Sequence, residues 1–549
     1  MTFIDRGEST MRSKKLMHGP RAIPILFLFI PMILPFPAAA QDIPAAAPTS
    51  PEKAPLALTL DACIIQAVKK NLGVAVQVYS SLLADSALTR AGEKFLPSLS
   101  FDFSSQKTNS ASYSWIQSAD VLSQSSKSYG GSLTQLIPLG GRLSLSLGAG
   151  RYESNSQFQI INPSYNGSLS FSLTQPLLKD FGLETTRREI LIARNNKDIA
   201  ANDLRATLID TVYSVERAYW ELVFRIEALK VRRQSLKLAE DLLEKNRKEI
   251  EIGTRAPKEI LTAQAAVAAR KADILQAEQL VKDCADNLRG LINLPFDRDP
   301  GAEIVPVDRP DFAKREVGLD DTLALALKNR PDLQSSALEI RSREMDYSFA
   351  KNQMLPVLDL RADYWSPGLS GDRILYLDDN PLTGVVLGKV PGGASLAMRD
   401  ALSFKYKNWT VALTLTIPLS SVLTRAAQAE AKAGLDRQIA RMKSLELSAI
   451  LEIRAAVRAV QTDYERVGAY KIARELAEQT LAAEVAKLEA GLSSNFFVLQ
   501  YQQNLAGARE AELRAVIDYT LSLDRLDKAA GVSLDKRNIT LTDATEVRS

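Results

Sequence analysis

Four segments of the chain alternate strictly between apolar and polar residues. In the first of them, Leu99, Phe101 and Phe103 are separated by an aspartate and serines. A period of two places the apolar residues on one face of a β-strand and the polar residues on the other. Aromatic residues near several segment ends are typical of strands that cross a membrane, although half-buried strands of soluble sheets alternate in the same way. The segments are 98–104, 168–174, 358–364 and 409–417.

Two further alternating segments form a candidate hairpin in the first half of the chain. Ser128–Ile137 and Arg142–Arg151 flank a turn that contains Gly140 and Gly141. The sequence leaves open whether this hairpin crosses a membrane or lies in an outer loop. The second half carries instead a long loop with glycine and proline, residues 366–403.

The pattern changes to a helical period over two very long segments. Glu184–Ile252 contains neither glycine nor proline, and Val422–Ala490 contains no proline. At 1.5 Å per residue each helix would be roughly 100 Å long, far beyond the usual three to four turns. Apolar residues recur at steps of three and four, which predicts packing against neighbouring helices as in a coiled coil. After each long helix come a turn and a return helix of about 36 residues, Lys258–Asn293 or one that begins at Phe496.

The chain is a tandem duplication. Leu60–Lys69 aligns without a gap with Leu319–Lys328, and at the same offset Leu96-Pro97 aligns with Leu355-Pro356. Each copy has a helix of about 36 residues, a Leu-Pro break and then a run of strict alternation. We therefore expect a first repeat at 56–293, an equatorial linker at 294–317, a second repeat at 318–530 and a C-terminal tail at 531–549.

Helix lengths predict how the repeats pack. A return helix and a repeat helix together have about the same length as one long helix. We therefore expect Lys258–Asn293 to stack end to end with Leu319–Met354. The C-terminal return helix would stack on Leu60–Phe95, so that two long helices alternate with two composite ones, and the linker and tail would form a belt at mid-height. About four strands cannot close a barrel. Since open sheet edges are not tolerated in lipid, other copies of the chain must complete the sheet.

The N-terminus is typical of a secretory signal. A basic stretch precedes the apolar run Ala22–Phe36, and the small residues up to Ala40 suit cleavage after that residue. A membrane anchor is the alternative, but the run is short for a spanning helix and is interrupted by Pro24, Pro31 and Pro35. We expect residues 1–40 to be a signal peptide and residues 41–55 to be a flexible lead-in.

Composition argues against several classes of function. The only histidine, His18, lies in the predicted signal, so the mature chain has none for a Ser-His-Asp triad or a His-ligated zinc site. No nucleotide-binding loop or metal-ligand spacing is present, so we expect neither an enzyme nor a bound metal or cofactor. The net charge is +3 without a basic face, which argues against nucleic-acid binding. Cys63 and Cys284 are expected to be buried helix residues, although a disulfide between them stays open.

The order of several duplicated motifs resembles the TolC family of outer-membrane efflux proteins. The resemblance rests on the repeated Leu-Asp to Leu-Pro unit, on Gln175–Leu177 and Ile417–Leu419, and on the turns that begin at Gly253 and Gly491. It covers about residues 56–534, nearly all of the mature chain. It implies an α+β membrane protein of the cell outer membrane: a homotrimer whose shared β-barrel, with about four strands from each protomer, continues into a periplasmic tunnel of long coiled-coil α-helices.

The resemblance also implies a role for the two turns at the ends of the long helices. They would contact a periplasmic adaptor protein, which couples the channel to an inner-membrane pump or ABC transporter, and the pore would be constricted beside the first turn. Phe497 stands where the second repeat would carry an acid, so an acidic gate would not be symmetric. Helix capping alone also explains a glycine at each turn. The docking residues would be Gly253, Thr254, Arg255, Gly491, Leu492 and Ser493, and the constriction residues Arg255 and Glu259.

The resemblance therefore implies a passive duct subunit of a tripartite efflux or type I secretion system. The main alternative is a periplasm-spanning coiled-coil structural protein or adhesin without a conducting lumen, which would share the long helices but would not need duplicated strands. A general porin would need more strands and no long helices. The transported substrate cannot be read from the sequence.

Overall fold

The computed structural model describes residues 56–112, 119–252, 258–295, 304–310 and 312–540. The predicted signal peptide and lead-in lie outside the described residues, as does the end of the predicted tail. Within the described ranges, no helix combines the length and the apolar character that a membrane crossing requires.

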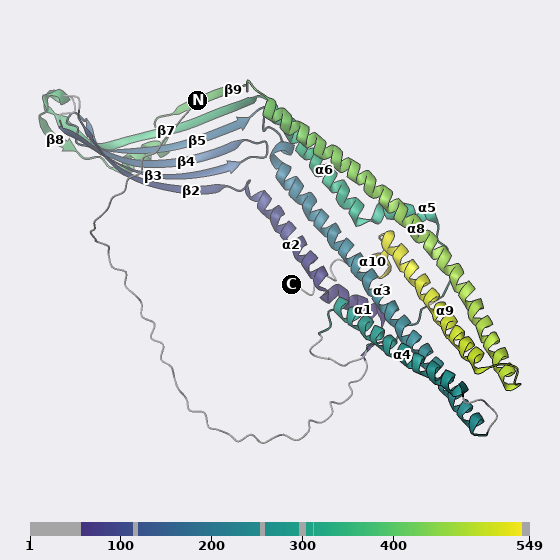
Figure 1. Cartoon of the computed structure of the whole chain (residues 1–549). Helices are drawn as coiled ribbons and strands as arrows, with labels where there is room; N and C mark the ends of the chain where they lie inside the picture. The colour runs from purple at the N-terminus through teal and green to yellow at the C-terminus, as the bar shows by residue number, and fades with distance from the viewer. Residues whose placement is uncertain (1–55, 113–118, 253–257, 296–303, 311, 541–549) are drawn as a thin grey trace, which may run out of the picture. The chain divides into compact units, whose positions relative to one another are not determined.

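Seven antiparallel strands form one large sheet (Figure 1). Its order is β2-β3-β4-β5-β7, and both β8 and β9 pair with β7. The four alternating segments lie in β2, β5, β7 and β9, and the candidate hairpin is β3 and β4. Because β3 pairs with β2 and β4 pairs with β5, the hairpin is an integral part of the same sheet. The strands are β2 (Ser98–Ala111), β3 (Val121–Leu136), β4 (Arg142–Ser154), β5 (Ile161–Pro176), β7 (Val357–Tyr376), β8 (Val386–Val390) and β9 (Asn408–Thr416).

The strand register gives the sheet one apolar and one polar face. A single row of paired residues crosses six strands on the apolar face: Leu99, Leu133, Leu145, Phe171, Tyr364 and Trp409. On the polar face, the hydroxyl oxygens of Ser100 and Ser132 lie 2.8 Å apart, and Arg361 pairs with Asp363 at 2.8 Å. The period of two that the sequence predicts therefore sorts the side chains across the whole sheet.

The loop after β7 is structured. It contains the short 3₁₀ helices η2 (Leu377–Asp379) and η3 (Pro381–Thr383), the strand β8 and the helix α7 (Ala394–Leu402). Helix α7 packs against β5 and β7.

Both long helices begin and end within a residue or two of the predicted bounds. They are α3 (Leu183–Glu251), with 69 residues, and α8 (Val422–Glu489), with 68 residues. The return helices are α4 (Lys258–Leu291) and α9 (Asn495–Ala529). Helix α3 packs against α2, α4, α6 and α9, and α8 packs against α6 and α9 (Figure 1).

The two repeat helices, each predicted to be continuous, are both broken. In the first repeat α1 (Leu60–Lys70) ends at Asn71, whose side-chain oxygen then accepts the backbone N–H of Gly73 and caps α2 (Leu72–Glu93). In the second repeat α5 (Leu319–Asn329) ends at Arg330, before α6 (Pro331–Asn352). Proline disfavours a helical conformation in the residue before it, which explains this second break.

The predicted partners of the stacked helices are wrong. Return helix α4 ends at the α1–α2 break, where Asn71 Nδ2 donates to the carbonyl of Leu291 (2.9 Å) and Asn293 Nδ2 donates to the carbonyl of Lys70 (3.0 Å). Return helix α9 ends at the α5–α6 break, where Arg330 Nη1 donates to the carbonyl of Ala529 (3.2 Å). Each composite therefore joins helices of the same repeat. Long and composite helices still alternate, in the order α2/α4, α3, α6/α9, α8.

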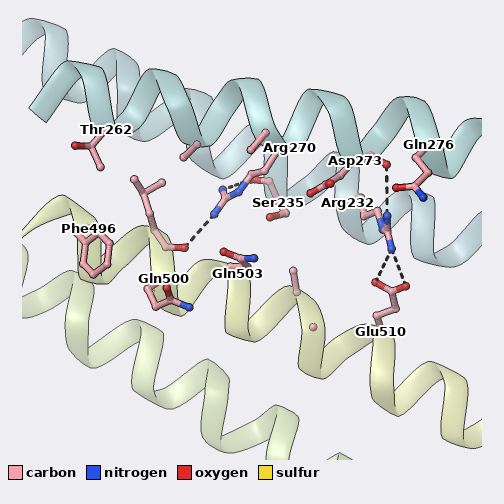
Figure 2. Close-up of a pocket in the computed structure, with 15 residues that line it drawn as sticks. Arg232, Ser235, Thr262, Arg270, Asp273, Gln276, Phe496, Gln500, Gln503 and Glu510 are labelled. Carbon is pink, nitrogen blue, oxygen red and sulfur yellow. Dashed lines mark hydrogen bonds and ion pairs between the residues drawn. The ribbon is translucent and has the colours of Figure 1, made fainter.

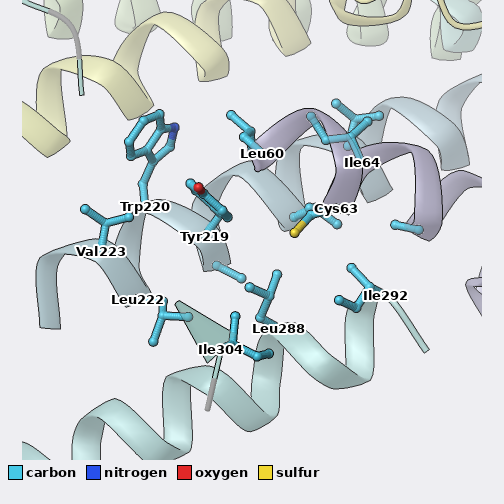
Figure 3. Close-up of a cluster of buried hydrophobic side chains, with 14 of the residues drawn as sticks. Leu60, Cys63, Ile64, Tyr219, Trp220, Leu222, Val223, Leu288, Ile292 and Ile304 are labelled. Atoms are coloured by element: carbon cyan, nitrogen blue, oxygen red, sulfur yellow. The ribbon is translucent and has the colours of Figure 1, made fainter. Parts of the chain in front are cut away.

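A small parallel sheet joins the start of the first repeat to the linker. Strand β1 (Leu56–Leu58) pairs with β6 (Ile304–Pro306), and Ile304 is buried among α1, α3 and α4 (Figure 3). The Tyr219 hydroxyl of α3 donates to Asp308 (2.9 Å), and the same carboxylate accepts the first N–H of α1 from Leu60 (2.6 Å). In the second repeat the Tyr519 hydroxyl donates to the carbonyl of Ala313 (2.8 Å). Two buried tyrosines, one from each repeat, thus hold the linker segment at two points.

Both cysteines are free thiols: Cys63 lies in the core cluster of the first repeat, and the half-buried Cys284 packs against that cluster. Cys63 is fully buried (Figure 3), and burial, with a smaller contribution from Asp308, raises the pKa of its thiol to about 11. Burial likewise raises the pKa of the Cys284 thiol. Thiols with raised pKa values are poor nucleophiles, which fits a packing role for both residues.

The segment after α9 is docked by a buried group of charges. Arg537, just beyond α10 (Ser533–Lys536), pairs with Asp61 of α1 (2.8 Å) and with the buried Glu216 of α3 (2.9 Å). One carboxylate oxygen of Asp524 on α9 is buried and lacks a hydrogen-bond partner in the described structure. Burial, and then the charge of Glu216, raise the pKa of Asp524 to about 8. The C-terminal segment is therefore held by the ion pairs of Arg537, beside a buried carboxyl group whose charged form is disfavoured.

The raised pKa of Asp524 predicts a pH-dependent effect of Asp524→Asn. The folded state binds the proton more tightly than the unfolded state, so the contribution of Asp524 to stability falls as pH rises from about 4 to about 8. An asparagine cannot ionise. The melting temperature of the variant should therefore exceed that of the wild type by several degrees at pH 8, and by much less at pH 5. Scanning calorimetry in detergent measures both values.

The exposed Asp198→Asn variant on α3 is the matched control, because it removes one acidic group without changing a buried site. It should change the melting temperature little at either pH. A difference between Asp524→Asn and wild type that is the same at pH 5 and pH 8 would contradict the assignment.

Candidate functional site at the helix turns

The turn between α8 and α9 is built on a left-handed glycine. Gly491 has a φ of +77° and follows the last residues of α8. Its N–H donates to the carbonyl of Leu488 (3.1 Å), and the N–H of Leu492 donates to that of Lys487 (2.9 Å). This is the hydrogen-bonding pattern of a glycine C-cap, in which a side chain would strain the backbone. The capping role of Gly491 is thus part of the geometry, and a docking role stays a prediction.

The residues after Gly491 present both polar and apolar groups. The Ser493 hydroxyl donates to Glu484 and lowers the pKa of that carboxyl group, and Lys487 lies 3.3 Å from the same carboxylate. Leu492 is 79% exposed. Phe496 and Phe497 are also exposed, with ring centroids 5.6 Å apart. The turn therefore carries an exposed apolar surface of the kind that protein partners cover.

A buried asparagine joins this turn to the neighbouring helical hairpin of α3 and α4. Asn495, at the start of α9, is 1% exposed, and its Nδ2 donates to Asn246 Oδ1 of α3 (2.9 Å). The same amide donates to Glu259, in the first turn of α4. Glu259, predicted from the resemblance as a constriction residue, therefore contacts the second repeat. Gly253, Thr254 and Arg255, predicted at the first turn, lie outside the described residues.

Sequence reasoning missed Asn495 and Asn246. The only available signal was an amide side chain directly after the turn, and that signal also fits an ordinary helix start.

A cavity of about 580 Å³ lies where α9 packs beside α3 and α4, close to the turns (Figure 2). Arg270 of α4 donates to the carbonyl of Ser235 (2.7 Å) on α3 and to the carbonyl of Leu499 (3.1 Å) on α9, and its burial lowers its pKa. Further along, Arg232 pairs with Glu510 at 3.1 Å. Arg270 bonds to carbonyl oxygens of α3 and α9, and Arg232 of α3 pairs with an acid of α9, so these contacts tie three helices together.

The described residues contain no group of three or more His, Cys, Asp or Glu side chains that could hold a metal ion. The site therefore consists of two helix turns and the polar contacts that connect them, on a duplicated fold of long helices and a membrane-type sheet.

This fold, with two repeats of long helices and one large sheet, belongs to a family that the comparisons identify. The sequence model of the outer membrane efflux protein family matches residues 135–294 and 322–532, one segment in each repeat. Because these segments make up more than half of the chain, the chain belongs to this family. It is an outer-membrane protein, as the export signal and the resemblance predict.

Two curated relatives from Pseudomonas putida are the probable efflux pump outer membrane protein TtgC and the antibiotic efflux pump outer membrane protein ArpC. Each is 21% identical over 328 residues, which is 60% of this chain. The match spans 61% of the length of each relative, less than two thirds.

Solved structures of outer-membrane channels share the fold. The CmeC outer membrane channel of Campylobacter jejuni has a TM-score of 0.62 at 15% identity, covering 88% of this chain and 90% of that one. The outer membrane protein VceC of Vibrio cholerae has a TM-score of 0.60 at 15% identity, covering 86% and 96%. The predicted fold class, with long helices, a β-sheet part and an internal duplication, is confirmed.

The buried contacts of Asn495 predict a change in the mobility of both turns. Asn495→Ala leaves the buried Asn246 and the Glu259 carboxylate without this donor. The loss should destabilise the folded contact by about 1–3 kcal/mol. Amide hydrogen exchange should rise roughly 5- to 100-fold around both turns. Mass spectrometry of the labelled protein measures this change.

The matched control is Gln500→Ala, because the exposed Gln500 side chain bonds only within α9, to Asn504 (3.1 Å). It should leave exchange at the first turn unchanged. Equal exchange in Asn495→Ala and wild type would show that Asn495 does not couple the turns.

Proposed function

We propose that this chain is the outer-membrane channel subunit of a tripartite efflux or type I secretion system. As a homotrimer it conducts substrates passively from periplasm-spanning machinery to the exterior. It acts as a conduit and not as an enzyme, and it needs no cofactor. The main support for the proposal is that the sheet, which has one apolar face, is open at both edges.

Each edge strand has one partner within the described residues. Strand β2 pairs with β3 and strand β9 pairs with β7. Both edges expose large apolar side chains, among them Phe101 (80% exposed) and Trp409 (72% exposed). In hydrocarbon, the free N–H and C=O groups of an edge have no water to bond. Further copies of the chain must therefore pair β2 with β9, and the family resemblance sets their number at three.

The helices support the same assembly. Helices α2 and α8 lie at opposite ends of the packing order within one chain. Each of these helices carries apolar residues that are more than half exposed. Among them are Val76 and Leu83 on α2, and Leu447 and Leu451 on α8. In a trimer with a closed sheet, α8 of one copy meets α2 of the next, which buries these residues in a continuous ring of helices.

The partners follow from the proposed role. The turn residues Gly253, Thr254, Arg255, Gly491, Leu492 and Ser493 would contact a periplasmic adaptor, which links the channel to an inner-membrane pump or ABC transporter. A signal peptide at residues 1–40 would direct export, residues 41–55 would be a lead-in, and no nucleic acid is involved. A coiled-coil tether without a lumen would account for the long helices but would not account for the sheet.

The proposal predicts a conducting trimer. The mature chain, purified from outer membranes in mild detergent, should have the mass of three copies by light scattering. After reconstitution into a planar bilayer it should form stable ion-conducting pores. A well-folded, water-soluble monomer without conductance would leave the coiled-coil structural protein as the better interpretation.

The predicted constriction can be tested in the same bilayers. Removing both charged groups with Arg255→Ala and Glu259→Ala should raise single-channel conductance by on the order of twofold, because charged side chains at the narrowest point limit ion flow. Glu259 also contacts Asn495, so Glu259→Gln is the control that keeps the hydrogen bond and removes the charge. Unchanged conductance in the double variant would exclude this constriction.

A further inference from the structure

Helix α7 lies directly on the apolar face of the sheet. Its backbone touches Gly167 of β5 and Gly368 of β7, which are paired in the sheet register. A Cβ atom at Gly167 would lie 2.7 Å from the carbonyl oxygen of Ala397, and one at Gly368 would overlap the same oxygen. Glycine at both positions therefore allows the close approach. By the alternation of side chains, both glycines share the face of Phe171 and Tyr364.

Aromatic packing continues this contact. Phe404, two residues after α7, stacks on Phe171 (centroids 6.3 Å apart) and on Tyr364 (5.5 Å). Ala397 and Ala401 are buried against the sheet. On its other side the segment exposes Leu396, Leu402 and Tyr406. The exposed apolar surface of α7 is therefore continuous with the apolar face of the sheet.

The position of α7 along the strands places it at one boundary of that face. Strand β5 ends at Pro176, shortly before the long helix α3. The span from Gly167 to Pro176 matches the roughly nine to eleven residues that a tilted strand needs to cross the hydrocarbon layer. Helix α7 therefore lies at the membrane boundary remote from the helices, which is the outer leaflet if the proposed function holds.

Basic residues gather at this boundary. On β3, Lys127 lies two residues beyond Tyr129, toward the end of the strand that is remote from the helices. Lys127 pairs in register with Arg151 of β4. By the alternation of side chains, it shares the apolar face with Tyr129. Arg151 is neutralised by Glu153 (2.9 Å) and Lys405 by Asp400 (2.7 Å). Among the described residues, no acidic side chain forms an ion pair with Lys107, Lys127, Arg399 or Lys407. We use the name basic band for Lys107, Lys127 and Arg151 on the apolar-face rows of β2, β3 and β4, together with Arg399, Lys405 and Lys407 in α7 and the segment after it.

We propose that the basic band and α7 bind the phosphate groups of an anionic lipid in the outer leaflet. The acyl chains would lie on Leu396, Leu402 and the apolar face below. Along β2 and β3, apolar, aromatic and basic residues follow one another in the order of acyl chain, interface and headgroup, and a peptide partner would not require this order. Electrostatic attraction to anionic headgroups adds to the apolar burial of α7. The inference rests on the proposed function, which sets the sheet in the outer membrane.

The test compares two lipids on the full-length trimer in neutral detergent. Native mass spectrometry counts bound molecules of a diphosphorylated glucosamine disaccharide lipid and of its dephosphorylated form. The wild type should prefer the phosphorylated lipid. In the variant Lys127→Gln/Arg399→Gln/Lys407→Gln the Kd for this lipid should rise roughly 100-fold, while the Kd for the dephosphorylated lipid stays the same.

The matched control Lys432→Gln/Arg441→Gln/Lys443→Gln removes three exposed charges from α8 and should leave both Kd values unchanged. Equal affinity of the wild type for the two lipids, or an unchanged Kd in the first variant, would overturn the lipid site. Trimers that instead associate with one another through α7 and exclude lipid would overturn it too. Conductance of the same preparation separates the two proposals: conducting trimers without headgroup preference refute the lipid site alone, and a protein that neither trimerises nor conducts refutes both.

Discussion

The assembly depends on one constraint, which is that a β-strand in hydrocarbon must have a hydrogen-bonded neighbour on each side. Strands β3, β4, β5 and β7 meet it within the chain, and β2 and β9 do not within the described residues. A single copy therefore cannot remain in a membrane with its edges unpaired. In the proposed trimer, closing the sheet with further copies also brings α8 of one copy to α2 of the next, because each helix is joined to an edge strand. The exposed apolar side chains of α2 and α8 are then buried by the same step that pairs the strands.

The helical part solves a second problem, which is how to support two helices of about 69 residues. Such helices depend on packing along their whole length. Within one chain, α2, α4, α6 and α9 supply that packing for α3, and α6 and α9 supply it for α8. Every segment end leaves backbone groups to satisfy. The first repeat satisfies them with the side-chain amides of Asn71 and Asn293, and the second uses the guanidinium of Arg330. The duplicated architecture is therefore kept while the chemistry of the junction differs.

The sequence predicts those parts of the fold that local pattern controls. Strict alternation locates β2, β5, β7 and β9, and the absence of proline sets the extent of α3 and α8. Length alone cannot decide which helices stack, because all four shorter segments have similar lengths. The break at Arg330 has a local signal in Pro331, but the break at Asn71 depends on an amide that reaches Leu291. At the turns, Gly491 is predictable as a cap. The role of Asn495 is not, since its partners lie 249 and 236 positions away.

This contact bears on how docking and gating are related in the proposed channel. Asn495 belongs to the second repeat, and its buried amide binds Asn246 and Glu259 beside the first turn. The start of α9, after the second turn, and the parts of α3 and α4 next to the first turn therefore share one buried hydrogen-bonding group, and we expect this group to couple them energetically. A partner that moves α9 at its N-terminal end must break or carry with it the contact to Glu259. Because Glu259 is also the proposed constriction residue, an adaptor bound to the second turn alone would act on the first, and opening need not involve separate contacts at both turns.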